Sequence, residues 1–155
     1  MEMTKQELKK LCKADGLYGT PHINDKIYLH YKGFRAIENL DEYIGLKCIW
    51  LEGNGFDTIQ GLEKLTQLRT VYLHENLIRT IEGLHTLKDL DTLNLSKNFI
   101  SKIEGLEECQ KLSNLNMANN NLKTAKSIEH VLKVILCMCI RVKNRKLKVY
   151  FSVIE

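Results

Sequence analysis

Two histidines and a glutamate recur at one interval along this chain. His30, Glu52 and His74 stand 22 residues apart, and side chains of these types can hold zinc or exchange protons. The fixed interval indicates a repeating unit, so the three side chains would lie on three successive strands. The histidines would then be roughly 10 Å apart, whereas each ligand of one zinc ion lies about 2 Å from it. The spacing therefore argues against a metal or acid–base centre.

The cysteines favour packing over catalysis. The five are Cys12, Cys48, Cys109, Cys137 and Cys139. Their number is odd and their spacing fits no disulfide framework, which suits a reducing compartment. The C-x-C pair is a weak metal signal on an apolar run. No serine or cysteine is paired with a base by a recognisable motif, and no glycine-rich phosphate loop is present. We therefore expect no enzyme, no cofactor, no metal and no small-molecule substrate.

An aromatic residue stands two positions before each of His30, Glu52 and His74. These residues are Tyr28, Trp50 and Tyr72, and Asn94 and Asn116 continue the series at the same interval. If these positions point outward from a sheet, the rings form a contiguous row of the kind that dominates protein-binding surfaces. The alternative is cross-strand stacking that only stabilises the sheet. We favour partner binding, with His30, Glu52 and His74 beside the row.

The elements that must position these residues are leucine-rich. The template L-x-x-L-x-L-x-x-N ends at each of Asn54, Asn76, Asn98 and Asn120. This is the leucine-rich-repeat signature, and it predicts an α/β solenoid. Alternating apolar residues would form a parallel sheet on the concave face of a right-handed horseshoe, with short 3₁₀ or helical turns on the convex face. The four asparagines are expected to form a structural ladder by bonding backbone groups at each turn.

One more unit lies upstream in degraded form. Subtracting 22 from the apolar positions of the second unit gives Ile27, Leu29, Phe34 and further apolar residues, while Lys32 occupies the asparagine position. Terminal repeats are commonly atypical, because one side faces a cap. We therefore predict five repeats over residues 24–132.

The two ends of the chain differ from the repeats. Residues 1–23 are predicted to be a helical cap, because Thr4 to Glu7 form a capping-box pattern before an apolar stripe. Residues 133–155 are read as an irregular basic tail or a degenerate repeat. The apolar run that starts at Val131 could be a strand pairing onto the fifth repeat, a sixth repeat with a late Asn144, or a truncated or aberrant terminus.

Composition limits the remaining classes of function. The chain has 155 residues, 44% of them hydrophobic, and a net charge of +4. One domain is expected at this length. The excess positive charge lies within residues 141–148, a run more typical of a solvated segment than of a nucleic-acid or membrane surface. The first residues lack an apolar signal core, so secretion is not expected.

The N-terminal block resembles a known family more closely than the repeats do. The repeat template alone is similar to the short leucine-rich-repeat class that includes a phosphatase regulatory subunit, a spliceosomal protein and several ciliary proteins. The block is similar to the dynein axonemal assembly factors. The matching residues are Leu11-Cys12-Lys13, Leu17-Tyr18, Thr20-Pro21, Asn24-Asp25, Tyr28-Leu29-His30, Lys32-Gly33-Phe34, Ile37 to Leu40, Glu42-Tyr43, Gly45-Leu46, Trp50-Leu51 and Asn54-Gly55.

This resemblance implies a cytoplasmic protein-interaction scaffold, needed to preassemble dynein arms for motile cilia. Its partners would be axonemal dynein chains or their assembly co-factors, with no nucleic acid and no membrane. Members of that family continue with further repeats, a cap and a long acidic tail, which residues 132–155 do not match. The alternatives are a phosphatase-regulatory or spliceosomal scaffold, which the repeats alone would equally permit, and a nucleic-acid-binding module that uses the basic tail.

Overall fold

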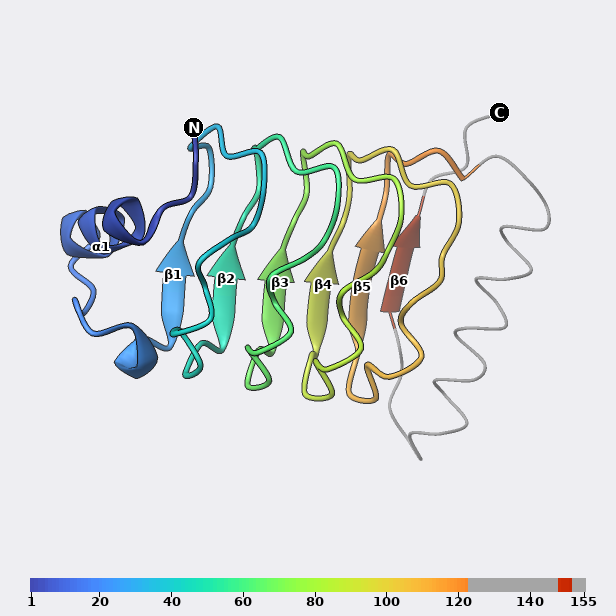
Figure 1. Ribbon diagram of the computed structural model, residues 1–155. Helices are drawn as coiled ribbons and strands as arrows, with labels where there is room; N and C mark the ends of the chain where they lie inside the picture. Colours follow the sequence, from blue (N-terminus) through green and yellow to red (C-terminus); the bar gives the residue numbers. More distant parts are fainter. Residues whose placement is uncertain (123–147, 152–155) are drawn as a thin grey trace.

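The repeats form one parallel sheet in the computed structural model, which describes residues 1–122 and 148–151. Six strands lie side by side in chain order (Figure 1). They are β1 (Lys26–Tyr28), β2 (Cys48–Trp50), β3 (Thr70–Tyr72), β4 (Thr92–Asn94), β5 (Asn114–Met117) and β6 (Lys148–Phe151). The predicted parallel-sheet solenoid is confirmed.

The register repeats the sequence period. Ile27 pairs with Ile49, and Ile49 pairs with Val71, so each step across the sheet moves 22 residues along the chain. These central strand residues are fully buried, whereas the residues on either side of them are half-buried or exposed. Alternation of this kind turns one face of each strand to the core and leaves the other open. We call the open side the sheet face; it corresponds to the predicted concave face.

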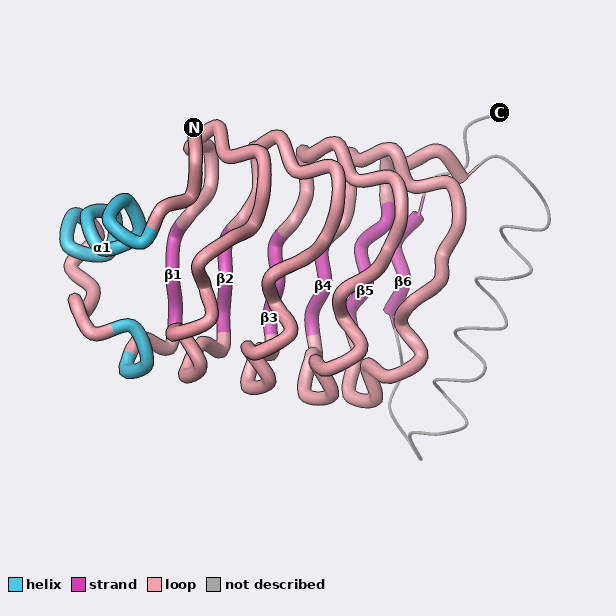
Figure 2. Tube along the Cα trace, viewed as in Figure 1, coloured by secondary structure: helices cyan, strands magenta, loops and turns pink. Residues whose placement is uncertain are grey.

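The return segments opposite the sheet are turns and loops (Figure 2). In the second unit, Leu65 N donates to Leu62 O at 2.9 Å, and Leu68 N donates to Leu65 O at 3.0 Å. Bonds between residues three apart are those of a 3₁₀ turn. Within residues 1–122 and 148–151, the one regular 3₁₀ helix is η1 (Pro21–Ile23). A 22-residue unit is too short to place a longer helix on this side.

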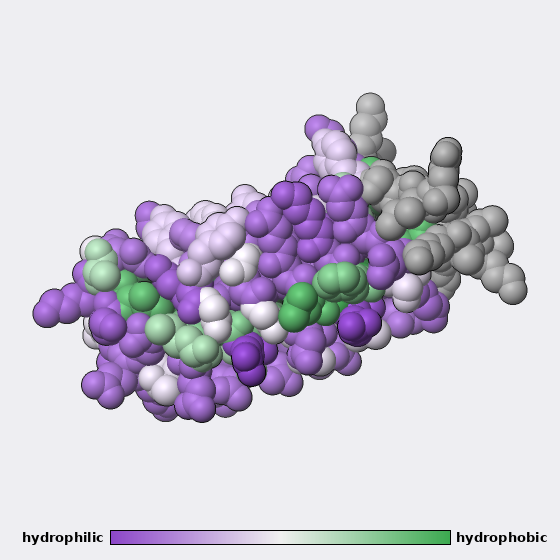
Figure 3. Space-filling view, turned by 90° about the horizontal axis from the view of Figure 1, so that it is seen from above, coloured by the Kyte–Doolittle hydropathy of each residue, from purple (hydrophilic) through white to green (hydrophobic). Residues whose placement is uncertain are grey.

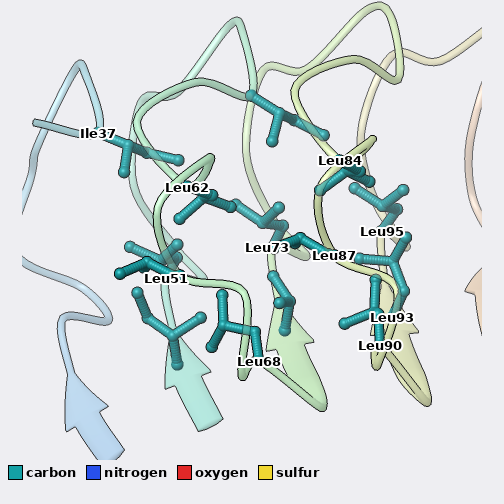
Figure 4. Packing of buried hydrophobic residues seen from close by; sticks show 14 of the residues in the cluster. Ile37, Leu51, Leu62, Leu68, Leu73, Leu84, Leu87, Leu90, Leu93 and Leu95 are labelled. Carbon is teal, nitrogen blue, oxygen red and sulfur yellow. The ribbon is translucent and has the colours of Figure 1, made fainter. Parts of the chain in front are cut away.

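Leucine side chains from the strands and the returns meet in one core (Figure 4). Leu73 and Leu95 come from the strand side, while Leu62, Leu84 and Leu87 come from the returns, and each is 0% exposed. Each side chain packs against equivalents in the units before and after it. Burial is therefore shared between neighbours, and no unit has a core of its own.

Helix α1 (Lys5–Ala14) lies beside β1 at the first end of the sheet. Thr4 caps it, because its side-chain oxygen accepts from Glu7 N at 3.1 Å. The reciprocal capping-box bond is not made among the described residues; Glu7 Oε1 lies 3.5 Å from Lys10 Nζ instead. Leu8 and Cys12 are buried against the first repeat. The helix thus covers apolar residues that a solenoid end would otherwise expose.

The four asparagines link consecutive units through backbone groups. Asn98 Nδ2 donates to Leu73 O and to Leu95 O, both at 3.0 Å, and Asn98 Oδ1 accepts from Ile78 N at 3.1 Å. Asn76 and Asn120 make the equivalent bonds and are also buried, whereas Asn54 is half-buried. We call this set the asparagine ladder. It satisfies backbone donors and acceptors where each strand ends.

Strand β6 extends the sheet beyond the fifth repeat. It pairs in parallel with β5, with Lys148 opposite Asn114 and Val149 opposite Leu115. The structure thus assigns a sixth strand to Lys148–Phe151. The apolar run that starts at Val131, the alternative sixth repeat at Ile135 and its Asn144 lie outside the described residues.

Candidate functional site

The residues predicted for partner binding are aligned across the sheet. Tyr28 pairs with Trp50, Trp50 with Tyr72, Tyr72 with Asn94 and Asn94 with Asn116. These five residues form what we call the central row. All are half-buried, and each alternates with fully buried neighbours. The side chains of the row therefore lie on the sheet face.

The aromatic part of the central row is a continuous stack. The ring centroids of Tyr28 and Trp50 are 4.6 Å apart, with planes inclined by 35°. Those of Trp50 and Tyr72 are 5.6 Å apart, inclined by 25°. Because adjacent strands are about 4.8 Å apart, the stacking axis runs across the strands. The rings partly cover one another, which explains why they are half-buried rather than fully exposed.

The two ends of the stack meet different surroundings. Lys26 Nζ lies 5.9 Å from the centroid of the Tyr28 ring, within the range of a cation–π contact. At the other end, burial and then the nearby Cys48 and Glu52 raise the pKa of Tyr72. The Tyr72 phenol is therefore neutral at physiological pH. An aromatic surface with hydroxyl and indole groups offers both apolar area and hydrogen-bonding atoms.

Beyond Tyr72 the central row changes from rings to amides. Asn94 Oδ1 accepts from Ser96 N at 3.1 Å and from Ser96 Oγ at 2.9 Å. Asn94 Nδ2 consequently faces His74 Nδ1, at 3.2 Å. Since the amide nitrogen is a donor, His74 Nδ1 is the acceptor in this contact. In the next unit, Asn116 Oδ1 accepts from Ala118 N at 3.1 Å.

The second predicted set, His30, Glu52 and His74, lies beside the stack. The His30 ring meets Tyr28 edge-on at 6.2 Å, and the His74 ring meets Tyr72 in the same way at 6.4 Å. His30 Nδ1 and Glu52 Oε2 are buried atoms without a hydrogen-bond partner. Among residues 1–122 and 148–151, no three His, Cys, Asp or Glu side chains are grouped closely enough to hold a metal ion.

The cysteine on the sheet face is not activated. Burial, followed by the charges of Glu52 and Asp25, raises the pKa of the Cys48 thiol to about 11. A thiol with such a pKa stays protonated at neutral pH, whereas a nucleophilic cysteine needs a depressed pKa. Cys12 and Cys109 are buried in the core.

Sequence reasoning missed a polar network at the edge toward which the strands point. Tyr31 Oη donates to Glu75 Oε2 at 2.9 Å, and Lys97 Nζ donates to Glu75 Oε1 at 2.6 Å. Hydrogen bonds from Lys97 and Tyr31 lower the pKa of the Glu75 carboxyl. Tyr31 reaches Glu75 across Gly53, where an added Cβ would lie 2.1 Å from the Tyr31 ring. Tyr31, Gly53 and Glu75 occupy the same repeat position in successive units. The small residue between two large ones is the feature of the sequence that could have predicted this contact.

Two apolar side chains are exposed at the same edge. Leu77 is 48% exposed and Phe99 45%, and they follow consecutive ladder asparagines. Arg79 lies over the Phe99 ring, with its Cζ 5.7 Å from the centroid. Figure 3 views this edge and shows hydrophobic patches within a mainly hydrophilic surface. This pair lies outside the predicted binding set.

Solved structures with the same architecture define the fold class. The chain matches a crystal structure of the Drosophila melanogaster SNF/U2A' complex over 100% of its length, with a TM-score of 0.70 and 19% identity, covering 86% of that chain. It matches internalin C2 from Listeria monocytogenes over 88% of its length, with a TM-score of 0.66 and 19% identity, covering 59% of that chain. The protein has a leucine-rich-repeat fold.

Sequence similarity is high over a shorter stretch. The chain is 65% identical over 49 residues to dynein axonemal assembly factor 1 of Rattus norvegicus and 63% identical over 49 residues to that of Homo sapiens. It is 64% identical over 50 residues to the homolog of Drosophila erecta. Each match covers 32% of this chain, and between 3% and 8% of the relative. The matched stretch lies in the N-terminal repeat region.

No protein-family model matches the chain. Within the described ranges, 1–122 and 148–151, no helix is long and apolar enough to cross a membrane.

Proposed function

We propose that this chain is a non-enzymatic protein-interaction scaffold that acts in the cytoplasmic preassembly of axonemal dynein arms. The observation that carries the scaffold role is the stack of Tyr28, Trp50 and Tyr72 on the sheet face. The dynein role is supported by relatives of 63–65% identity that are named dynein axonemal assembly factor 1. Dynein chains or their assembly co-factors are the proposed partners.

The physical case for binding rests on where the rings lie. A core residue gains from burial within the chain, but these rings lie on the outer side of the sheet and are only half-buried. Tyr and Trp at such positions offer large, rigid contact area at a low cost in side-chain entropy. A partner seated on the central row would bury their remaining surface, and Asn94 and Asn116 would supply polar contacts at its margin.

The proposal is tested with the variant Tyr28→Ala, Trp50→Ala, Tyr72→Ala. Tagged parent and variant chains are used to capture partners from a lysate of ciliated cells, and bound dynein chains and assembly factors are quantified. We expect the variant to bind a partner about 30-fold more weakly or worse, the loss typical of a hot spot. Circular dichroism should show an intact fold, because the core leucines are unchanged.

A matched control removes the same number of large side chains elsewhere. Tyr18→Ala, Ile44→Ala, Phe99→Ala changes three exposed residues outside the central row and should capture partners as the parent does. Equal capture by the aromatic variant would refute a binding role for the row. Capture of phosphatase subunits or splicing proteins in place of dynein-assembly proteins would refute the dynein role.

A further inference from the structure

We propose that a partner on the sheet face inserts two aromatic side chains, two residues apart in an extended segment, into a gap between Tyr72 and Tyr150. The inference rests on the proposed function of the sheet face and names the chemistry of what binds there. Tyr72 lies in the central row on β3, and Tyr150 lies on β6 at the far end of the described sheet.

Strand β6 adds one more ring in line with the central row. Tyr150 pairs with Asn116, the last member of that row. The preceding residue, Val149, packs against the core, so Tyr150 points to the opposite side of the strand, which is the sheet face. Tyr150 is 56% exposed. From β3 to β6 the line therefore reads ring, amide, amide, ring.

The two amides leave a gap between the rings. Asn94 and Asn116 lie on β4 and β5, which separate β3 from β6 (Figure 1). A tyrosine side chain is longer than an asparagine side chain, so Tyr72 and Tyr150 form two walls and the amides form the floor between them. Three steps of about 4.8 Å from strand to strand place the Cα atoms of the two tyrosines about 14 Å apart.

The width of the gap fits two more rings. The stacked rings of Tyr28, Trp50 and Tyr72 have centroids 4.6 and 5.6 Å apart, so two added rings would continue the row at nearly the same interval. Side chains two residues apart in an extended segment lie on one face, about 6.7 Å from each other. Centred in the gap, each would lie about 4 Å from the nearer tyrosine, which is van der Waals contact.

The amides on the floor already make hydrogen bonds within the chain. Asn94 Oδ1 accepts from Ser96 N and Ser96 Oγ, and Asn94 Nδ2 donates to His74 Nδ1. Asn116 Oδ1 accepts from Ala118 N. An aromatic ring can therefore cover both amide oxygens without leaving either of them unpaired.

The surroundings disfavour arginine, the other side chain that stacks on tyrosine. A guanidinium has five N–H donors and is best paired with a carboxylate. The outward positions of β3 to β6 and of the residues that follow β3 to β5, namely 70, 72, 74, 92, 94, 96, 114, 116, 118, 148 and 150, include no aspartate or glutamate. Lys148, two residues before Tyr150, is exposed and adds positive charge beside the gap. Uncharged aromatic side chains therefore fit the gap better.

The experiment selects phage-displayed random 15-residue peptides on the full chain. Selected peptides are synthesised, and their dissociation constants are measured for the parent and for variants of the gap. Tyr150→Ala removes one wall, and its control is Tyr18→Ala, which removes a similarly exposed tyrosine outside the sheet face. Asn94→Tyr with Asn116→Tyr fills the gap. Its control, Asn94→Ala with Asn116→Ala, removes the same amides and leaves the gap open.

We expect the selected peptides to be enriched in pairs of aromatic residues separated by one residue. Tyr150→Ala should weaken their binding about fivefold or more, since it removes a ring–ring contact. Filling the gap should weaken it about tenfold or more. Both controls should bind nearly as the parent does. Circular dichroism checks the fold of each variant. If filling the gap unfolds the chain, Tyr150→Ala decides alone, because it changes an exposed side chain.

Unchanged binding of these peptides by Tyr150→Ala would overturn the proposal. Selected peptides without aromatic pairs would do so too, as would the recovery of no binding peptide, because an extended segment should suffice. Self-association of the parent that Tyr150→Ala abolishes, measured by analytical ultracentrifugation, would assign the gap to a second copy of the chain and also overturn it.

Trp50→Ala separates this inference from the proposed function. If Trp50→Ala weakens peptide binding while Tyr150→Ala does not, the central row binds but the gap is not used, and only this inference fails. If neither change affects binding, the sheet face is not the binding surface, and the proposed function fails with it.

Discussion

Replacing Asn98 with leucine tests the asparagine ladder, because the two side chains have similar size and only one can hydrogen-bond. Asn98 is 5% exposed and bonds four backbone groups, which are Leu73 O, Leu95 O, Ser96 O and Ile78 N. A leucine has the same branching at Cγ but can neither donate nor accept, and its methyl groups cannot approach backbone atoms as closely as the amide does. The change therefore removes these bonds without opening a cavity.

The four backbone groups are not equally affected. Leu73 O also accepts from Asn76 Nδ2, Leu95 O from Asn120 Nδ2, and Ser96 O from Glu75 N, so each carbonyl keeps one partner. Ile78 N has no other hydrogen-bond acceptor among the described residues and becomes unpaired. One unpaired buried N–H costs about 1–3 kcal/mol, and each lost second bond about 0.5–1.5 kcal/mol. We expect Asn98→Leu to lower the free energy of unfolding by about 3 kcal/mol.

Urea denaturation followed by circular dichroism measures this loss, and Asn54→Leu provides the matched comparison. Asn54 makes equivalent bonds but is half-buried, so water can replace part of what it supplies. Asn54→Leu should therefore cost clearly less than Asn98→Leu. A loss below about 1 kcal/mol for Asn98→Leu, or an equal loss for the two variants, would show that the ladder is not held by buried hydrogen bonds.

Two further changes test the backbone and the core. Gly83 has φ of +69°, and an added Cβ would lie 2.3 Å from Ile59 O. Gly83→Ala should therefore lower the free energy of unfolding, measured by urea denaturation, by at least about 2 kcal/mol. The control Gly19→Ala, whose added Cβ has no atom within 4 Å, should lower it by less than about 0.5 kcal/mol. Burial raises the pKa of Cys109 to about 12, whereas an unfolded thiol ionises near pH ~8.5; the unfolded chain therefore loses its proton first. Stability should fall as pH rises from about 9 toward 12, by up to about 1.4 kcal/mol per pH unit from this group, and less steeply in Cys109→Ala; equal slopes would contradict this.

The buried residues of the repeats could be predicted because every unit has an equivalent space to fill. Leu51, Leu73 and Leu95 must fill the same space between neighbouring units, and all three are fully buried. The period of 22 residues then sets the register across the whole sheet. The burial of Met3, whose carbonyl accepts from Asn39 Nδ2 at 2.8 Å, could not be predicted in this way. That contact joins the cap to a return loop 36 residues away and belongs to no repeating pattern.

Side-chain positions on the sheet face could be predicted, but their environments could not. The period places Tyr28, Trp50 and Tyr72 in one row, since strand residues alternate between faces. It does not give the angles between the rings, which depend on χ angles that each ring adopts against its neighbours. The missing partner of Glu52 is likewise a property of the assembled face, because it depends on where His30 and His74 point.

The contrast between interior and face also bears on function. At interior positions, packing against both neighbours limits every unit to residues of similar size and polarity. The central row is free of that limit, and it changes from three rings in β1 to β3 to two amides in β4 and β5. Stacking alone would favour rings along the whole row, because each additional ring would gain the same cross-strand contact. We therefore propose that the central row, which stops after three rings, is matched to a partner rather than to the sheet itself.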